Sequence, residues 1–278
     1  AACVAVTQDD AAGDTLNDAY RSGLFVRVVD LEAGRYAFHG AFRKALRDHL
    51  VHRSPAKSAE LHRRASLFHS ATGQALLSLE QANASGDAEF LADQLEKLAN
   101  DLIYGGYLFR IDEVASELPW SIISTRPMLL LALAWRRIRR LSYAAAERLI
   151  SAAEAIAQGR PEDHQLSYLV RHRKIMLAAA RDQMSIVEGD AEQLLLDLGD
   201  SEPYLSCSLL GQLMSARHEF YHRHDLLKLE AATRRIMERP GAQFASITLR
   251  ATVAPSYIAQ GKIDVALRLL EESLSMAE

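Results

Sequence analysis

The residue types and spacing most able to do chemistry occur at His218, Glu219 and His222, which form an H-E-x-x-H pattern. On a helix this spacing places two imidazoles one turn apart, where they can bind zinc, and the glutamate can activate a water molecule. A catalytic zinc also needs a third protein ligand. The sequence has neither the extended H-E-x-x-H-x-x-G-x-x-H pattern nor a convincing downstream glutamate, and His224 should point away from the pair. A zinc-dependent hydrolase is therefore the alternative, and ordinary helix residues are the favoured interpretation.

Arginine clusters offer a second chemistry, the binding of anions or nucleic acid. They occur at residues 62–64 (His-Arg-Arg) and at four arginines between 136 and 140. On helices rich in glutamate, a solvated or inter-domain charged face is the simpler interpretation. The chain carries 32 Lys and Arg against 36 Asp and Glu, a net charge of −4, which creates no basic field for phosphate backbones. We expect no nucleic-acid binding by this stretch itself.

Other chemistries lack the residues they need. Cys3 and Cys207 stand alone, without metal-ligand spacing, and no Ser or Cys has a nucleophile-elbow context. No G-x-x-x-x-G-K-[ST] loop occurs, and the longest apolar run, residues 128–135, is far shorter than the roughly 20 residues of a membrane span. We expect a cytoplasmic segment with no enzymatic activity, no membrane contact and no cofactor of its own.

The first part of the chain indicates a winged-helix tail. Residues 24–29 and 35–38 are β-branched or aromatic and flank a turn-like segment, which predicts a hairpin. Phe42, Leu46 and Leu50 then recur at helical spacing, and a second amphipathic helix is expected over 56–70. Helix, hairpin, helix is typical of a winged-helix domain, of which residues 1–55 would be the C-terminal part.

The remainder is predicted to be helical throughout. Gly73, residues 85–87 and the pair at 105–106 divide helices over 74–84 and 88–102, so we assign 56–125 to a helical connector. Beyond it, turns expected near residues 141, 182, 224 and 261 repeat with a period of about 40, longer than the roughly 34 of a tetratricopeptide repeat. Residues 126–278 are therefore expected to stack about four helix pairs into a right-handed TPR-like solenoid, which makes the fold class mainly α.

In such a solenoid the first helix of each pair lines the concave face. The predicted register turns six residues inward, which together suit a small polar ligand or a partner's peptide: Trp135, Arg139, His172, Met176, His218 and Tyr221. Some of them must instead pack against the neighbouring repeat, Trp135 above all, because it lies in an apolar run.

Two segments resemble the MalT-like regulators, the large ATP-binding members of the LuxR type. The run Tyr36-Ala-Phe38-His39-Gly-Ala-Phe42-Arg43-Lys-Ala-Leu46 resembles the segment that ends their winged-helix part. The run Leu61-His62-Arg63-Arg64-Ala65, followed by Ala82-Asn-Ala-Ser-Gly86-Asp87, is similar to their next block. Gly40 and Ala41 replace an expected proline and leucine, and Gln81 stands where that family has histidine.

The resemblance implies a division of labour. An upstream module would bind ATP, the winged-helix and helical regions would transmit its state, the superhelix would sense a small-molecule inducer or a regulatory protein, and a C-terminal helix-turn-helix would bind DNA. It assigns signal transmission to His39, Phe42, His62 and Arg63, although His39 on its own is more often a packed residue beside the hairpin.

The ends of the sequence agree with that division. It begins without Met and stops at Glu278 inside an amphipathic segment, so we expect a piece of a longer protein, whose self-association is left open. A free-standing repeat scaffold is the third interpretation.

Overall fold

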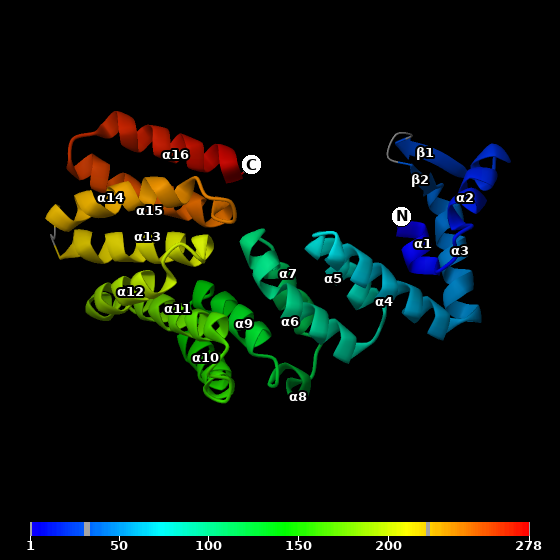
Figure 1. Ribbon diagram of the computed structural model, residues 1–278, viewed down its shortest axis with the longest axis horizontal. Coiled ribbons are helices and arrows are strands. Elements are labelled where there is room, and N and C mark those ends of the chain that lie inside the picture. Colours follow the sequence, from blue (N-terminus) through cyan, green and yellow to red (C-terminus); the bar gives the residue numbers. More distant parts are fainter. Residues whose placement is uncertain (1, 31–33, 221–222, 278) are drawn as a thin grey trace. The chain divides into compact units, whose positions relative to one another are not determined.

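The computed structural model describes residues 2–30, 34–220 and 223–277. These residues form sixteen helices and one two-stranded antiparallel sheet (Figure 1), which confirms the prediction of a mainly helical fold with a hairpin. The chain divides into two compact units between Leu98 and Ala99, inside helix α6 (Ala88–Tyr104). None of the helices described is long and apolar enough to cross a membrane.

The first unit contains the hairpin and the helices around it. Besides the first part of α6, its elements are α1 (Ala2–Thr7), α2 (Ala12–Arg21), β1 (Val26–Asp30), β2 (Arg35–Phe38), α3 (Gly40–Arg53), α4 (Pro55–Ala71) and α5 (Ala75–Ala84). Val26 pairs with Phe38 and Val28 with Tyr36, as expected for alternating β-branched and aromatic residues. The expected turn at residues 31–33 lies outside the described residues.

Aromatic rings join the hairpin to α3. The Phe42 ring lies 5.2 Å from that of Phe25 and 5.8 Å from that of Phe38, measured between centroids. His39 precedes α3, and its main-chain N–H donates to the Phe25 carbonyl at 2.8 Å, whereas its side chain is exposed. The main chain of His39 therefore fixes this junction, and its imidazole is not packed.

The two arginines of the 62–64 run form ion pairs within the first unit. Arg63 pairs with Glu60 and with Asp87, both at 3.1 Å, and Arg64 pairs with Glu60 at 2.8 Å. The second oxygen of Asp87 accepts the Phe90 amide at 3.1 Å and so caps the start of α6. One carboxylate thus connects α4 with the first turn of α6, and the run is not an open basic patch.

The second unit consists of successive helices that pair along the chain. They are α7 (Leu108–Ala115), α8 (Trp120–Ile123), α9 (Pro127–Arg139), α10 (Tyr143–Gln158), α11 (His164–Ala180), α12 (Met184–Leu198), α13 (Pro203–Glu219), α14 (Arg223–Met237), α15 (Gln243–Ala259) and α16 (Ile263–Ala277). Pro127 and Pro203 occupy the first turns of α9 and α13, where the missing amide hydrogen costs nothing.

The pairs build an inner and an outer layer. Helices α9, α11, α13 and α15 contact one another in that order, and α10, α12, α14 and α16 pack outside them (Figure 1). Most residues of α13 are buried, whereas α10 buries only Ala146, Ile150 and Ala153. Inner helices must therefore be apolar around most of their circumference, and outer helices need only one apolar face.

Turns between the helices of a pair fall close to the predicted places. Leu141, Asp182 and Gly261 have φ values of +58°, +60° and +75°. The next amide closes each turn, as when Lys262 donates to the Tyr257 carbonyl at 2.9 Å. The turn expected near residue 224 is wrong by a few residues, because α13 ends at Glu219 and residue 224 lies within α14.

The double role of Asp87 can be tested by substitution. Asp87→Ala removes the cap of α6 and the partner of Arg63, so we expect the free energy of unfolding to fall by about 1 to 2 kcal/mol. Asp87→Asn keeps an oxygen for the Phe90 amide and should lose less. Urea unfolding of both variants measures the difference, and equal losses would show that the cap contributes nothing.

Candidate functional site

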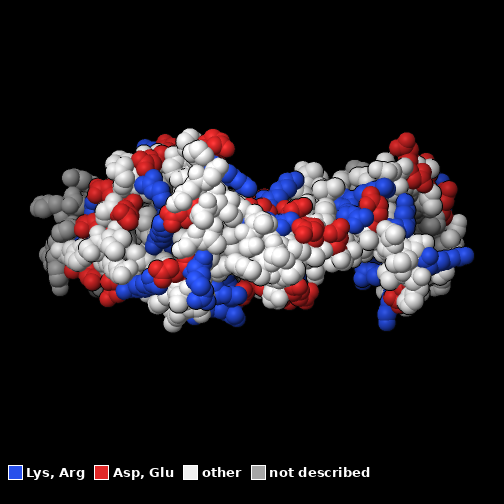
Figure 2. Space-filling model, turned by 90° about the horizontal axis from the view of Figure 1, so that it is seen from below, with Lys and Arg blue, Asp and Glu red and all other residues white. Residues whose placement is uncertain are grey.

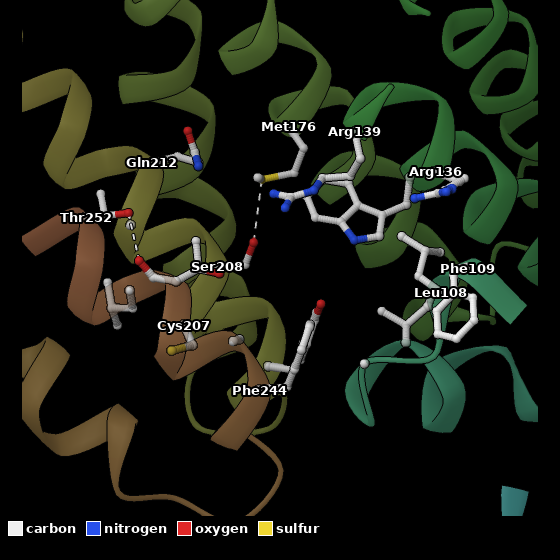
Figure 3. A pocket seen from close by; sticks show the side chains of 18 residues that line it. Leu108, Phe109, Arg136, Arg139, Met176, Cys207, Ser208, Gln212, Phe244 and Thr252 are labelled. Atoms are coloured by element: carbon white, nitrogen blue, oxygen red, sulfur yellow. Dashed lines mark hydrogen bonds between the residues drawn. The ribbon is translucent and has the colours of Figure 1, made fainter. Parts of the chain in front are cut away.

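A pocket of about 270 Å³ opens among the inner helices of the second unit (Figure 3). Its walls come from α9, α11, α13 and α15, and its rim from the end of α6, the α6–α7 turn and the start of α7. Side chains from all four inner helices reach this cavity, where a bound molecule could contact them together. The pocket is therefore the candidate functional site.

Helix α9 provides the cationic wall. Trp135, Arg136 and Arg139 line the pocket, since residues three or four apart on a helix share one face. Arg136 is held by Asp112 of α7, with 3.4 Å between Nε and Oδ2. Asp112 also pairs with Arg137 at 2.9 Å and with Arg140 at 3.6 Å. One carboxylate thus anchors three of the four arginines at the end of α9.

Polar groups of α13 and α15 line the opposite wall. The Ser208 hydroxyl donates to the Met176 sulfur at 3.6 Å, and the Thr252 hydroxyl donates to the Thr248 carbonyl at 2.9 Å. The Gln212 amide lines the same pocket and makes no hydrogen bond within the described part of the chain. Gln212 therefore offers both a donor and an acceptor to a bound molecule.

At the rim, the turn after α6 lies against the first turn of α15. Gly106 has φ +83° and ends α6, where the next amide, that of Tyr107, donates to Leu102. A Cβ added at Gly106 would lie 2.9 Å from the Phe244 ring of α15. Phe109 stands on the same rim and is 53% exposed. The α6–α7 turn and the first turn of α15 thus touch directly at the mouth.

A buried network lies directly behind Trp135. Arg173 is 1% exposed, and its guanidinium lies 5.1 Å from the centroid of the Trp135 ring. It donates to the Leu131 carbonyl at 3.2 Å and to His172 Nδ1 at 2.7 Å. Because arginine only donates, His172 carries its proton on Nε2, which has no partner among the described residues. Tyr104 stacks on Tyr204 at 4.1 Å beside this network.

Burial sets the protonation of the titratable groups here. Desolvation and the adjacent Arg173 lower the pKa of His172 well below its usual value, so this imidazole is neutral. Burial raises the pKa of Cys207, which lines the pocket, to about 12. Cys207 therefore stays a thiol, and the pocket has no nucleophile there.

The residues predicted to face a ligand are only partly brought together. Trp135, Arg139 and Met176 line the pocket, whereas His172 is fully buried behind Trp135. His218 is exposed in the last turn of α13, away from the pocket lining, and Tyr221 lies outside the described residues. Gly106, Leu108, Phe109 and Phe244 were missed, because nothing in the repeat pattern marks the first turn of α15 or the connector as facing the pocket.

The metal alternative gains no support from the structure. His218 and Glu219 are exposed at the end of α13, and His222 lies outside the described residues. Across 2–30, 34–220 and 223–277, no group of three or more His, Cys, Asp or Glu side chains could hold a metal ion.

The residues assigned to signal transmission lie in the first unit. His62 and Leu61 border a groove of about 320 Å³ between α1, α3 and α4, and His62 Nδ1 contacts Gln81 Oε1 at 2.8 Å. Arg63 is held by its two carboxylates, and Phe42 by the hairpin. These contacts place them at junctions between elements, and their part in transmission stays a prediction.

The neutral state of His172 makes the fold sensitive to acid. As the pH falls below 6.5, the unfolded chain takes up a proton at this residue before the folded chain does. The free energy of unfolding should therefore decrease as the pH is lowered below 6.5, by up to about 1.4 kcal/mol per pH unit. Urea unfolding over a pH series should show this slope reduced in His172→Gln and kept in a control, His218→Gln; the same slope in both variants would contradict the assignment.

The contact between Gly106 and Phe244 can be isolated with a matched control. Gly106→Ala and Gly241→Ala each place a Cβ at positive φ, at +83° and +86°, but only the first meets another side chain. Both should lose about 1 kcal/mol from backbone strain, and Gly106→Ala should lose more because the Phe244 ring must move. Thermal unfolding measures the difference, and equal Tm values would show that the rim contact adds no stability.

Comparisons with known proteins agree with this architecture. The family described as MalT winged helix domain matches residues 1–58. The HTH-type transcriptional regulator MalT of Yersinia pestis (strain Pestoides F) is 28% identical over 199 residues, which are 70% of this chain and 21% of that protein. The protein of the same name from Cronobacter sakazakii is 26% identical over 188 residues, 68% of this chain and 20% of that protein.

The chain thus spans about one fifth of the length of these curated relatives. No solved structure matches it significantly. The match over residues 1–58 covers the hairpin and α3, where the sequence had indicated a winged helix, and the similarity to MalT regulators extends over more than two thirds of the chain. These matches support a MalT-like protein, similar to the MalT winged helix domain over residues 1–58 and to MalT regulators over about 70% of the chain.

Proposed function

We propose that this chain is the sensor region of a MalT-like transcriptional regulator and that its effector binds in the pocket among α9, α11, α13 and α15. The pocket carries this proposal, because side chains from all four inner helices line one cavity. Its volume of about 270 Å³ is close to the lower end, about 300 Å³, of known small-molecule sites. A small-molecule inducer therefore suits it better than a regulatory protein.

The effector would act by linkage between the two units. Binding would favour one arrangement of the inner helices and so relieve or impose contacts with an upstream ATP-binding module, with a coupling of about 1 to 3 kcal/mol. The winged-helix region, with His39 and Phe42, and the helical region after it, with His62 and Arg63, would transmit the change. DNA contact would belong to a C-terminal helix-turn-helix module, and such a regulator would work in the cytoplasm, where promoter DNA is accessible.

We also propose a role without catalysis for this region. Figure 2 shows basic and acidic side chains interspersed over one face of the molecule, not a continuous basic surface. Cys207 is held as a thiol, and the metal alternative lacks a ligand set among the described residues. The relatives named above are regulators of transcription, and we propose that this chain contributes sensing, not DNA binding, to that activity.

The proposal is tested by filling the pocket in the full-length regulator. Ser208 faces the cavity from α13, so Ser208→Phe should occupy it and abolish the response of a promoter reporter to a metabolite extract of the host. Ser151→Phe places the same ring on the exposed face of α10 and should leave the response intact. Circular dichroism checks folding, and a full response from folded Ser208→Phe would overturn the proposal.

A further inference from the structure

The pocket has an unbalanced charge. Arg136 and Arg139 line it, and none of the described lining residues is Asp or Glu. Arg136 is compensated by Asp112, which also pairs with Arg137 and Arg140. Arg139 makes no ion pair and no side-chain hydrogen bond within the described part of the chain. The one arginine of the α9 cluster that lacks a carboxylate is thus a pocket residue.

A second cation lies one side chain deeper. Arg173 lies behind Trp135, and its hydrogen-bonding partners, a main-chain carbonyl and the neutral His172, carry no charge. No carboxylate lies within ion-pair distance of Arg173 in the residues described. A buried charge without a counter-ion is costly. The Trp135 ring between it and the pocket stabilises the guanidinium through its face but supplies no negative charge. Both uncompensated cations therefore favour negative charge in the same cavity.

The rest of the lining is largely apolar. Trp135, Phe109 and Phe244 present aromatic surface, and Met176 adds a polarizable thioether. Figure 3 shows Arg139 and Arg136 on one side of the cavity, with Gln212 and Thr252 across from them. Such a cavity can enclose an apolar body while a guanidinium holds one charged end, because the planar guanidinium matches the oxygens of a carboxylate or phosphate.

We propose that the pocket binds a small organic anion, a carboxylate or phosphate carried on an apolar or aromatic body, with Arg139 contacting the anionic group. This inference rests on the proposed function, since it names the chemical class of that effector. A neutral ligand of the same shape would leave Arg139 and Arg173 uncompensated and would displace water from Arg139 without replacing its hydrogen bonds.

Two fluorescent dyes of matched shape test this directly on the chain described here. Anilinonaphthalene sulfonate carries an anionic group on an aromatic body, and N-phenylnaphthylamine is the same body without the sulfonate. We expect the sulfonate to bind saturably at one site and with about tenfold higher affinity than the neutral dye, since a charge-assisted hydrogen bond contributes about 1.5 kcal/mol or more. Added salt should weaken the sulfonate only.

Matched arginine variants locate the anionic group. Arg139→Gln should weaken the sulfonate about tenfold and leave the neutral dye within about twofold. Arg140→Gln removes the neighbouring charge, which is 57% exposed and outside the pocket lining, and should change neither dye. If Arg139→Gln unfolds, Arg139→Lys keeps the charge without the planar fork and should give an intermediate loss.

The nature of the anion follows from displacement of the bound sulfonate dye. Displacement by benzoate identifies a carboxylate site, and displacement by phenyl phosphate identifies a phosphate site; either supports the inference. Equal displacement by uncharged phenol would overturn it.

The possible failures are distinguishable. Equal binding of both dyes, with no effect of Arg139→Gln, overturns the preference for an anion and leaves the proposed effector pocket standing. Absence of saturable binding by either dye removes the pocket as a binding site and overturns both proposals. Equal losses in Arg139→Gln and Arg140→Gln would show that only the general field of the α9 arginines attracts the sulfonate, which also overturns the assignment of Arg139.

Discussion

The second unit depends on one constraint, that each inner helix is covered on several sides at once. Helix α13 packs against α11, α12, α14 and α15, so most of its residues are buried. A helix in this position has almost no surface on which to carry polar groups. The polar side chains that it does carry, such as Ser208 and Gln212, can be solvated only where neighbouring inner helices leave a cavity. Packing and site formation are therefore two results of the same layering.

The same layering accounts for the unusual electrostatics of Arg173. Most buried arginines are paired with a carboxylate, because the desolvation of a lone cation is expensive. Here the charge is stabilised by a carbonyl, an imidazole and the face of an indole. Burial lowers the pKa of Arg173, but a guanidinium is basic enough to stay charged. A site that stores an uncompensated cation beside a cavity is stabilised most by a ligand that supplies the missing charge.

Much of this fold could be predicted from local patterns, and much of the site could not. Turns near Leu141, Asp182 and Gly261 follow from helical periodicity, and the hairpin follows from residue type. The concave register also pointed to Trp135, Arg139 and Met176, because it depends only on the helical repeat. It could not separate them from His172, since whether an inward side chain reaches the cavity depends on the neighbouring helix. Phe244 could not be predicted as a pocket residue for a related reason, because its partner Gly106 is distant in sequence.

The contact between Phe244 and Gly106 gives the pocket a mechanical property. It joins the α6–α7 turn to the fourth inner helix, so the rim spans every inner helix between them. A small rotation between successive helix pairs adds up along a solenoid. The width of the pocket opening therefore depends on all the angles between successive helix pairs. It changes whenever the curvature of the superhelix changes. A molecule bound at this opening would fix the total curvature of the superhelix while leaving each interface between helix pairs nearly unchanged.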